Sequence, residues 1–94
     1  MNIINLEFGK SDIRIAGNPY GKEVYKTQVK DKFDYNDKNI IVFPEQVKKI
    51  ASSFVQGFFS EIINSVGYAR FLELVDIQVS SDELRKQILE DLLY

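Results

Sequence analysis

The apolar residues of this chain recur with two different periods, and the period changes several times along the sequence. The segments with a strand-like pattern, either alternating or continuously apolar, are residues 2–8, 12–16, 40–43 and 75–79. The segments with a helical period are residues 22–33, 52–66 and 81–93, with residues 68–74 as a further helical turn or a connector. The order β-β-α-β-α-β-α predicts an α/β fold with a small, mostly parallel or mixed sheet of about four strands and helices packed on it.

The strand-like segments differ in how many of their faces are apolar. Leu6 and Phe8 share one face of the first segment, which predicts an edge strand, and Ile13 and Ile15 share one face of the second. Residues 40–43 are apolar at every position and are followed by Pro44. A run that is apolar on both faces predicts a central strand covered by helices on each side.

The helical segments carry apolar stripes of different widths. Tyr25, Val29 and Phe33 recur every four residues in the first, which predicts an amphipathic helix. In the second, apolar residues recur in pairs, which predicts a core helix ending at Gly67. These paired residues are Phe54, Val55, Phe58, Phe59, Ile62, Ile63 and Val66.

Two helix starts are predicted from capping signals. Ser80 as N-cap and Glu83 three residues later form a capping box, and Val79 can contact Leu84 as a hydrophobic staple. Ser52 or Ser53 is predicted to cap the core helix by accepting a hydrogen bond from a backbone amide.

Composition removes several classes of chemistry. The chain has 94 residues with no cysteine and no histidine, so the thiol nucleophile and the common zinc ligands are absent. Any catalysis would have to rest on carboxylates, hydroxyl groups, Lys or Tyr, and we expect no metal and no cofactor. Asp31, Asp34 and Asp37 recur every third residue, but they lie in a polar turn without the glycine and glutamate of a calcium loop. They are interpreted as a solvated loop.

Charge and hydropathy bear on location and partners. The formal charge of −2 argues against nucleic acid as a partner, and lysines 22, 26, 30 and 32 are interpreted as an ordinary wet helix face. Residues 1–50 hold nine basic and seven acidic side chains and residues 51–94 hold three and seven, a polarity that could orient a partner. With no signal-like segment and no run long enough to cross a bilayer, the sequence predicts a single cytoplasmic domain over residues 1–94.

One turn invites comparison with phosphate-binding loops. Residues 17–22 follow a predicted strand and open a predicted helix, but only three residues lie between the two glycines, and Glu23 follows Lys22. A Walker A loop needs four intervening residues and a Ser or Thr after the Lys. The main interpretation is a tight turn. The alternative is a nucleotide or phosphate sensor in which Gly17, Gly21 and Lys22 bind an anion at a helix N-terminus.

Ser52 and Ser53, at the start of the core helix, belong to a pattern that resembles a known family. The turn with Gly17, Gly21 and Lys22, followed by an apolar strand and by Ser52, Ser53 and Phe54 at the start of the core helix, resembles a small bacterial STAS-like family of unknown function. That family is distantly similar to the STAS domain of anti-sigma factor antagonists. The resemblance covers about residues 10–93.

The resemblance implies a STAS-like fold and a non-enzymatic regulatory or scaffolding protein that binds another protein, in some cases an ATPase related to histidine kinases. In STAS switch proteins a partner kinase phosphorylates a serine whose position corresponds to Ser53, so Ser53 is the candidate phosphoacceptor. Ala51 stands where those proteins have Asp, and Phe54 where they have Gly. The candidate partner-binding residues are Lys49, Ser52, Ser53 and Gln56.

A second association surface is an alternative. Tyr68, Phe71, Leu72 and Leu74 either close one end of the core or form a homodimer patch.

Overall fold

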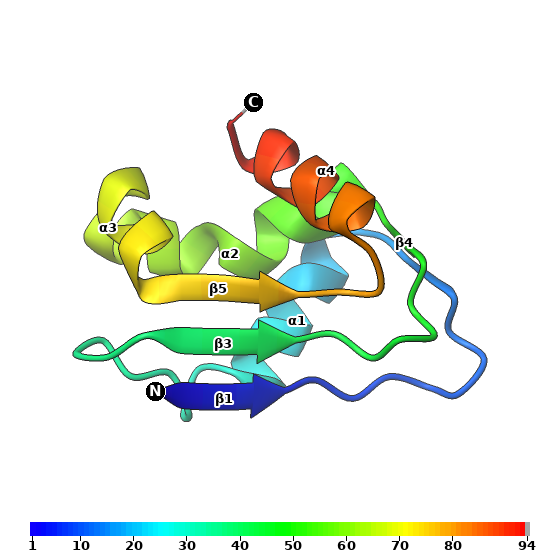
Figure 1. The fold of residues 1–94 in the computed structure, drawn as a ribbon, viewed down its shortest axis with the longest axis horizontal. Coiled ribbons are helices and arrows are strands. Elements are labelled where there is room, and N and C mark those ends of the chain that lie inside the picture. The colour runs from blue at the N-terminus through cyan, green and yellow to red at the C-terminus, as the bar shows by residue number, and fades with distance from the viewer. Residues whose placement is uncertain (94) are drawn as a thin grey trace.

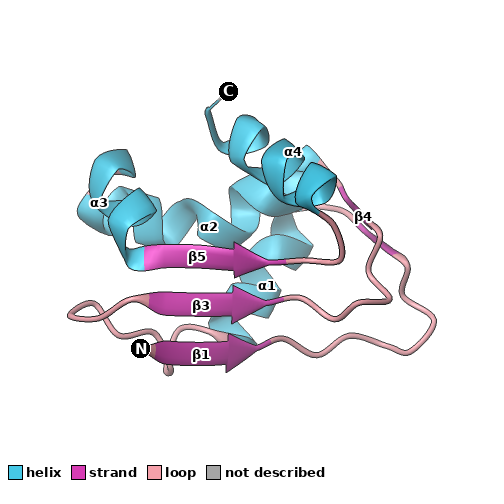
Figure 2. Cartoon of the chain, in the orientation of Figure 1, coloured by secondary structure: helices cyan, strands magenta, loops and turns pink. Residues whose placement is uncertain are grey.

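A computed structural model describes residues 1–93 and confirms the α/β class (Figures 1 and 2). In chain order the elements are β1 (Asn2–Asn5), β2 (Arg14–Ile15), α1 (Asn18–Gln28), β3 (Asn39–Val42), β4 (Lys49–Ile50), α2 (Ser52–Val66), α3 (Tyr68–Leu74), β5 (Val75–Gln78) and α4 (Asp82–Leu93).

The strands form two parallel sheets instead of one sheet of about four strands. The larger sheet has the order β1-β3-β5, so the predicted edge and central strands are confirmed. The predicted strand over residues 12–16 shortens to β2, which pairs with β4 outside that sheet. β4 has only two residues, too few for a repeating pattern to show in the sequence.

The larger sheet is covered on one face only. Ile4, Ile41 and Ile77 are aligned in the register and buried, whereas Ile3 on the opposite face is 58% exposed. Figure 1 shows α1 behind the strands. The prediction of helices on both sides of residues 40–43 is therefore wrong. The polar residues of β1 and β5 on the open face explain the difference, because they keep that face hydrated beside an apolar β3.

Helix α1 begins four residues earlier than predicted. Gly17, with φ of +104°, is its N-cap, and Pro19 lies in its first turn, where a missing N–H removes no helical hydrogen bond. The prediction of a turn over residues 17–21 is therefore wrong. The predicted apolar face is confirmed, since Tyr25, Val29 and Phe33 are all buried, although the last two follow the helix end at Gln28.

Helices α1 and α2 pack backbone to backbone through two glycines. A Cβ on Gly21 would collide with the carbonyl oxygen of Phe54 and lie 2.8 Å from the backbone nitrogen of Phe58. A Cβ on Gly57 would collide with the carbonyl oxygen of Asn18 and lie 2.9 Å from its carbonyl carbon. The close crossing places the starts of the two helices side by side.

Helix α2 is the centre of the core. Phe54, Phe58 and Phe59 are fully buried, and the rings of Phe54 and Phe58 stack with centroids 5.6 Å apart. The predicted stop at Gly67 is confirmed, with φ of +83°. The predicted serine cap is wrong: Ala51 occupies the N-cap position and makes no side-chain hydrogen bond.

The last two helices close the core. In α3, Phe71 and Leu74 are buried against it and Leu72 is 45% exposed. In α4, the capping serine is Ser81, whose Oγ accepts a hydrogen bond from the Leu84 N–H at 3.1 Å. The capping box predicted from Ser80 is wrong by one residue, because the Ser80 hydroxyl instead donates to the Val47 carbonyl at 3.1 Å.

Side chains cover the free backbone beside both outer strands. Gln28 accepts from the Glu7 N–H at 2.7 Å and donates to the Glu7 carbonyl at 2.9 Å, which imitates a neighbouring strand just past β1. On the other edge, Arg85 donates to the carbonyl of Ile77 in β5 at 3.2 Å. Covered edges protect a sheet against pairing with another chain.

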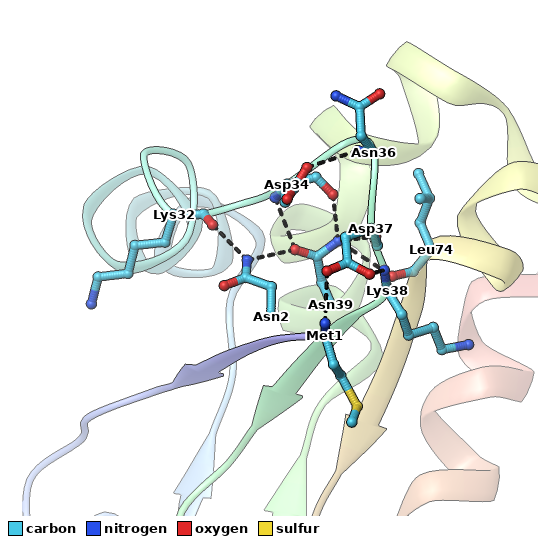
Figure 3. A network of polar contacts seen from close by, with 9 residues as sticks. All are labelled: Met1, Asn2, Lys32, Asp34, Asn36, Asp37, Lys38, Asn39 and Leu74. Carbon is cyan, nitrogen blue, oxygen red and sulfur yellow. Dashed lines mark hydrogen bonds and ion pairs between the residues drawn. The ribbon is translucent and has the colours of Figure 1, made fainter.

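A buried polar network holds the amino ends of the strands (Figure 3). Asn39, wholly buried, accepts from the Asp34 N–H at 2.8 Å and the Asn2 side chain at 2.7 Å. Its amide group donates to the carbonyls of Asp34 at 2.7 Å and Asp37 at 2.9 Å. One side chain thus joins β1, β3 and the turn between α1 and β3.

Candidate functional site

The serine pair lies at the carboxyl side of the strands, where parallel α/β folds usually place their binding sites. β4 leads directly into α2, and its pairing with β2 sets Arg14 opposite Lys49. Ile15 and Ile50 point into the core, so the preceding residues Arg14 and Lys49 both point to solvent. Alternation along two short strands therefore places two cations beside the start of α2.

Ser53 connects the two helix starts. Its Oγ accepts a hydrogen bond from the Gly17 N–H at 3.1 Å, and the residue is half-buried. This contact fixes the N-cap residue of α1 on the first turn of α2. Ser52 beside it is exposed.

The two serines should therefore respond differently to removal of the hydroxyl group. Ser53→Ala leaves the Gly17 amide without its partner and is expected to lower the free energy of unfolding by about 1 kcal/mol. Ser52→Ala at an exposed position is expected to change it by less than about 0.5 kcal/mol. Urea titration of both variants measures the difference, and equal losses would contradict the bridging role of Ser53.

Lys49, Ser52 and Gln56 form an exposed polar surface with Arg14, which we call the α2-start surface. Ser52 and Gln56 are four residues apart on one side of the helix. Arg14 and Lys49 make no ion pair with any residue between 1 and 93. The positive end of the α2 dipole adds to their charge, so this surface favours acidic groups.

A hollow of about 340 Å³ continues this surface toward α4. Arg14, Lys49 and Ala51 line it together with Gln87 from α4. Sequence reasoning missed Arg14 and Gln87. The alternating pattern of residues 12–16 predicted that Arg14 lies on the outer face of its strand. The pairing of β2 with β4, which sets Arg14 beside Lys49, was not predicted. No sequence pattern predicted that Gln87 of α4 lies next to these two residues.

The Gly17 to Lys22 segment has a different geometry from the predicted anion-binding turn. The Gly17 N–H donates to Ser53, and the Gly21 N–H donates to the Gly17 carbonyl at 2.9 Å. Gly21 is also buried against α2. Both amides proposed for an anion are thus engaged within the protein. Lys22 is exposed.

The acidic turn between α1 and β3 is built from local contacts. The Asp34 carboxylate accepts from the Asn36 N–H and the Asp37 carboxylate accepts from the Lys38 N–H, at 2.8 and 2.7 Å. A hydrogen bond from the Met1 amino group, with the one from Lys38, lowers the pKa of Asp37. These carboxylates order the turn, as expected for a solvated loop.

Comparisons with protein-family models, with curated proteins and with solved structures give no significant match to this chain. Over residues 1–93, no helix has the length and apolar character needed to cross a membrane.

Proposed function

We propose that the protein is a non-enzymatic regulatory or scaffolding module of the STAS-like type, and that it binds a partner protein through the α2-start surface. The partner class implied by the resemblance is a kinase-like ATPase or another regulator. The observation that carries the proposal is the exposure of Arg14, Lys49, Ser52 and Gln56 around the start of α2, with both cations free of ion pairs in the described chain.

The environment of Ser53 supports binding over catalysis. A serine nucleophile needs a general base within hydrogen-bond reach of its hydroxyl group. The contact made by the Ser53 Oγ is with a backbone N–H, which cannot remove a proton. The hydroxyl group therefore has a structural partner, and phosphorylation of Ser53 would first have to break the contact that holds α1 on α2.

Charge reversal on the α2-start surface tests the proposal. Lys49→Glu combined with Gln56→Glu is expected to abolish capture of the partner from a native cell lysate, because both changes oppose an acidic surface. Thermal unfolding should be unchanged, since both side chains are exposed. Capture is measured by affinity pull-down and mass spectrometry, with the wild-type chain alongside.

The matched control is Lys38→Glu, an exposed lysine that precedes β3 at the opposite end of the strands. This variant should retain the same partner as the wild type. If the doubly substituted chain still retains that partner, the α2-start surface is not the binding site. Mass spectrometry of the captured chain also reports whether Ser53 carries a phosphate.

A further inference from the structure

A second surface, separate from the α2 start, is a groove of about 430 Å³ between α1 and α2. Lys22 and Lys26 of α1 form one wall, together with Lys30, which lies two residues beyond the end of α1. Gly57, Ser60, Asn64 and Ser65 of α2 line it from the other side. The wall of α1 is thus basic, and the wall of α2 is made mostly of small polar residues.

Lys22 and Lys26 lie four residues apart on one side of α1, and Lys30 follows the end of the helix. The Lys30 Nζ pairs with the Glu61 Oε1 across the groove at 3.4 Å. Lys22 and Lys26 have no ion-pair partner between residues 1 and 93. These two lysines lie about 6 Å apart along the helix axis, because each residue of an α-helix rises 1.5 Å. The groove therefore offers two free cations at that spacing.

The α2 wall of the groove is polar and consists mostly of short side chains. Ser60 and Ser65 have short side chains, whose hydroxyl groups serve as hydrogen-bond donors and acceptors. Tyr25 also lines the groove, and burial, together with its neighbours Tyr35 and Glu61, raises the pKa of its hydroxyl group. A polar segment with negative charge fits this lining better than an apolar one.

We propose that this groove binds an acidic helical segment of a partner protein, in which two carboxylates four residues apart pair with Lys22 and Lys26. The spacing of the carboxylates on such a helix equals that of the lysines. The segment would lie along α1 and face the polar side chains of Ser60 and Asn64. This site is independent of the α2-start surface.

Nucleic acid fits the groove less well. Binding of single strands combines phosphate contacts with aromatic rings on which bases stack. The aromatic residue in the groove, Tyr25, is only 3% exposed, so its ring offers no such platform.

A second copy of this chain does not supply the required segment. Carboxylates in α4 occur at residues 82, 83, 90 and 91, and no two of them are three or four positions apart. Helices α1, α2 and α3 carry one acidic residue each: Glu23, Glu61 and Glu73. No helix of residues 1–93 therefore supplies such a pair, and the occupant that we propose is a segment of another protein.

The probe for the test is a synthetic alanine-based peptide of about 16 residues, long enough to be helical, with two glutamates four positions apart. We expect it to shift the amide resonances of residues 22–30 and 57–65 of the isotope-labelled protein. The same peptide with both glutamates replaced by glutamine should bind about tenfold more weakly. Equal affinity for the two peptides, or shifts confined to other residues, would overturn the proposal.

A charge-reversed protein provides the decisive comparison. Lys22→Glu combined with Lys26→Glu should weaken binding of the glutamate peptide by about tenfold, which corresponds to about 1.4 kcal/mol, and should gain binding of a lysine peptide of the same design. Lys86→Glu, an exposed lysine on α4, should leave both affinities unchanged. Loss of binding in the Lys86 variant would mean that net charge alone decides the affinity.

Two further measurements separate the other occupants. Tighter binding of a single-stranded oligonucleotide than of the glutamate peptide would overturn the assignment to an acidic protein segment. Analytical sedimentation tests for self-association of the chain. If the chain self-associates and the Lys22 and Lys26 substitutions abolish the association, the groove binds a second copy of this chain instead. Because the α2-start residues are not substituted here, failure of this test leaves the proposed function unaffected.

Discussion

Replacing Asn39 by aspartate is expected to lower the free energy of unfolding by about 3–4 kcal/mol at pH 7. The Asn39 side chain is wholly buried, and its amide group donates to the carbonyls of Asp34 and Asp37. A carboxylate has no proton to donate, so two carbonyl oxygens would face a buried negative charge. The loss can be measured by urea unfolding monitored by circular dichroism.

The pH dependence of the same variant distinguishes charge from packing. Burial next to carbonyls raises the pKa of the new carboxyl group above its unfolded value of about 3.9. The folded state then binds a proton more tightly than the unfolded state, so the destabilisation is largest above the raised pKa and shrinks as the pH falls toward about 4. A loss that stays constant between pH 7 and pH 4 would contradict a buried charge.

The matched control for this prediction is Asn36→Asp. Asn36 lies in the same turn, but it is exposed and only its backbone N–H is hydrogen-bonded there. Both variants replace an asparagine by an aspartate, but position 39 is buried and position 36 is exposed. We expect a change below about 0.5 kcal/mol.

Gly57→Ala is expected to destabilise the protein by about 2–3 kcal/mol, although alanine is the better helix former. At an open position in a helix the same change would stabilise by up to about 1 kcal/mol. Here the added Cβ would collide with the carbonyl oxygen of Asn18, a backbone atom that moves only if α1 moves. The sign of the effect therefore reports the contact between α1 and α2.

Two companion variants make this prediction sharp. Gly21→Ala should destabilise by a similar amount, because its Cβ meets the backbone of Phe54 and Phe58. Asn64→Ala on the exposed side of α2 should be neutral or slightly stabilising. If Gly57→Ala raises the melting temperature, the close crossing of the helices is absent in solution.

The serine pair shows how far the sequence reached toward the candidate site. The sequence placed Ser52 and Ser53 at the start of the core helix, and the structure has α2 beginning at Ser52. It did not reveal that Ser53 bonds to Gly17, because these residues are 36 positions apart and no periodic pattern links them. The structure also adds Arg14 to the surface by pairing β2 with β4.

The start of α1 shows the same limit in the fold. Gly17, Pro19 and Gly21 are turn-forming residues by local preference, and a turn is what they predict. In the folded protein Gly21 is helical, and the absence of a Cβ there lets α2 approach. A local preference of about 1 kcal/mol is outweighed by the burial of the large phenylalanines that the close crossing allows.

The sequence by itself determined the properties that depend on neighbours a few positions apart. These are the order of most strands and helices, the apolar faces that form the core, the edge position of β1 and the central position of β3. Tertiary structure alone decided which segments pair and cross: β2 with β4, Ser53 with Gly17, Asn39 with β1, and the lysines of α1 with the small residues of α2. The physical reason is that such contacts join residues far apart in the chain, and their geometry is fixed only when the common core excludes water.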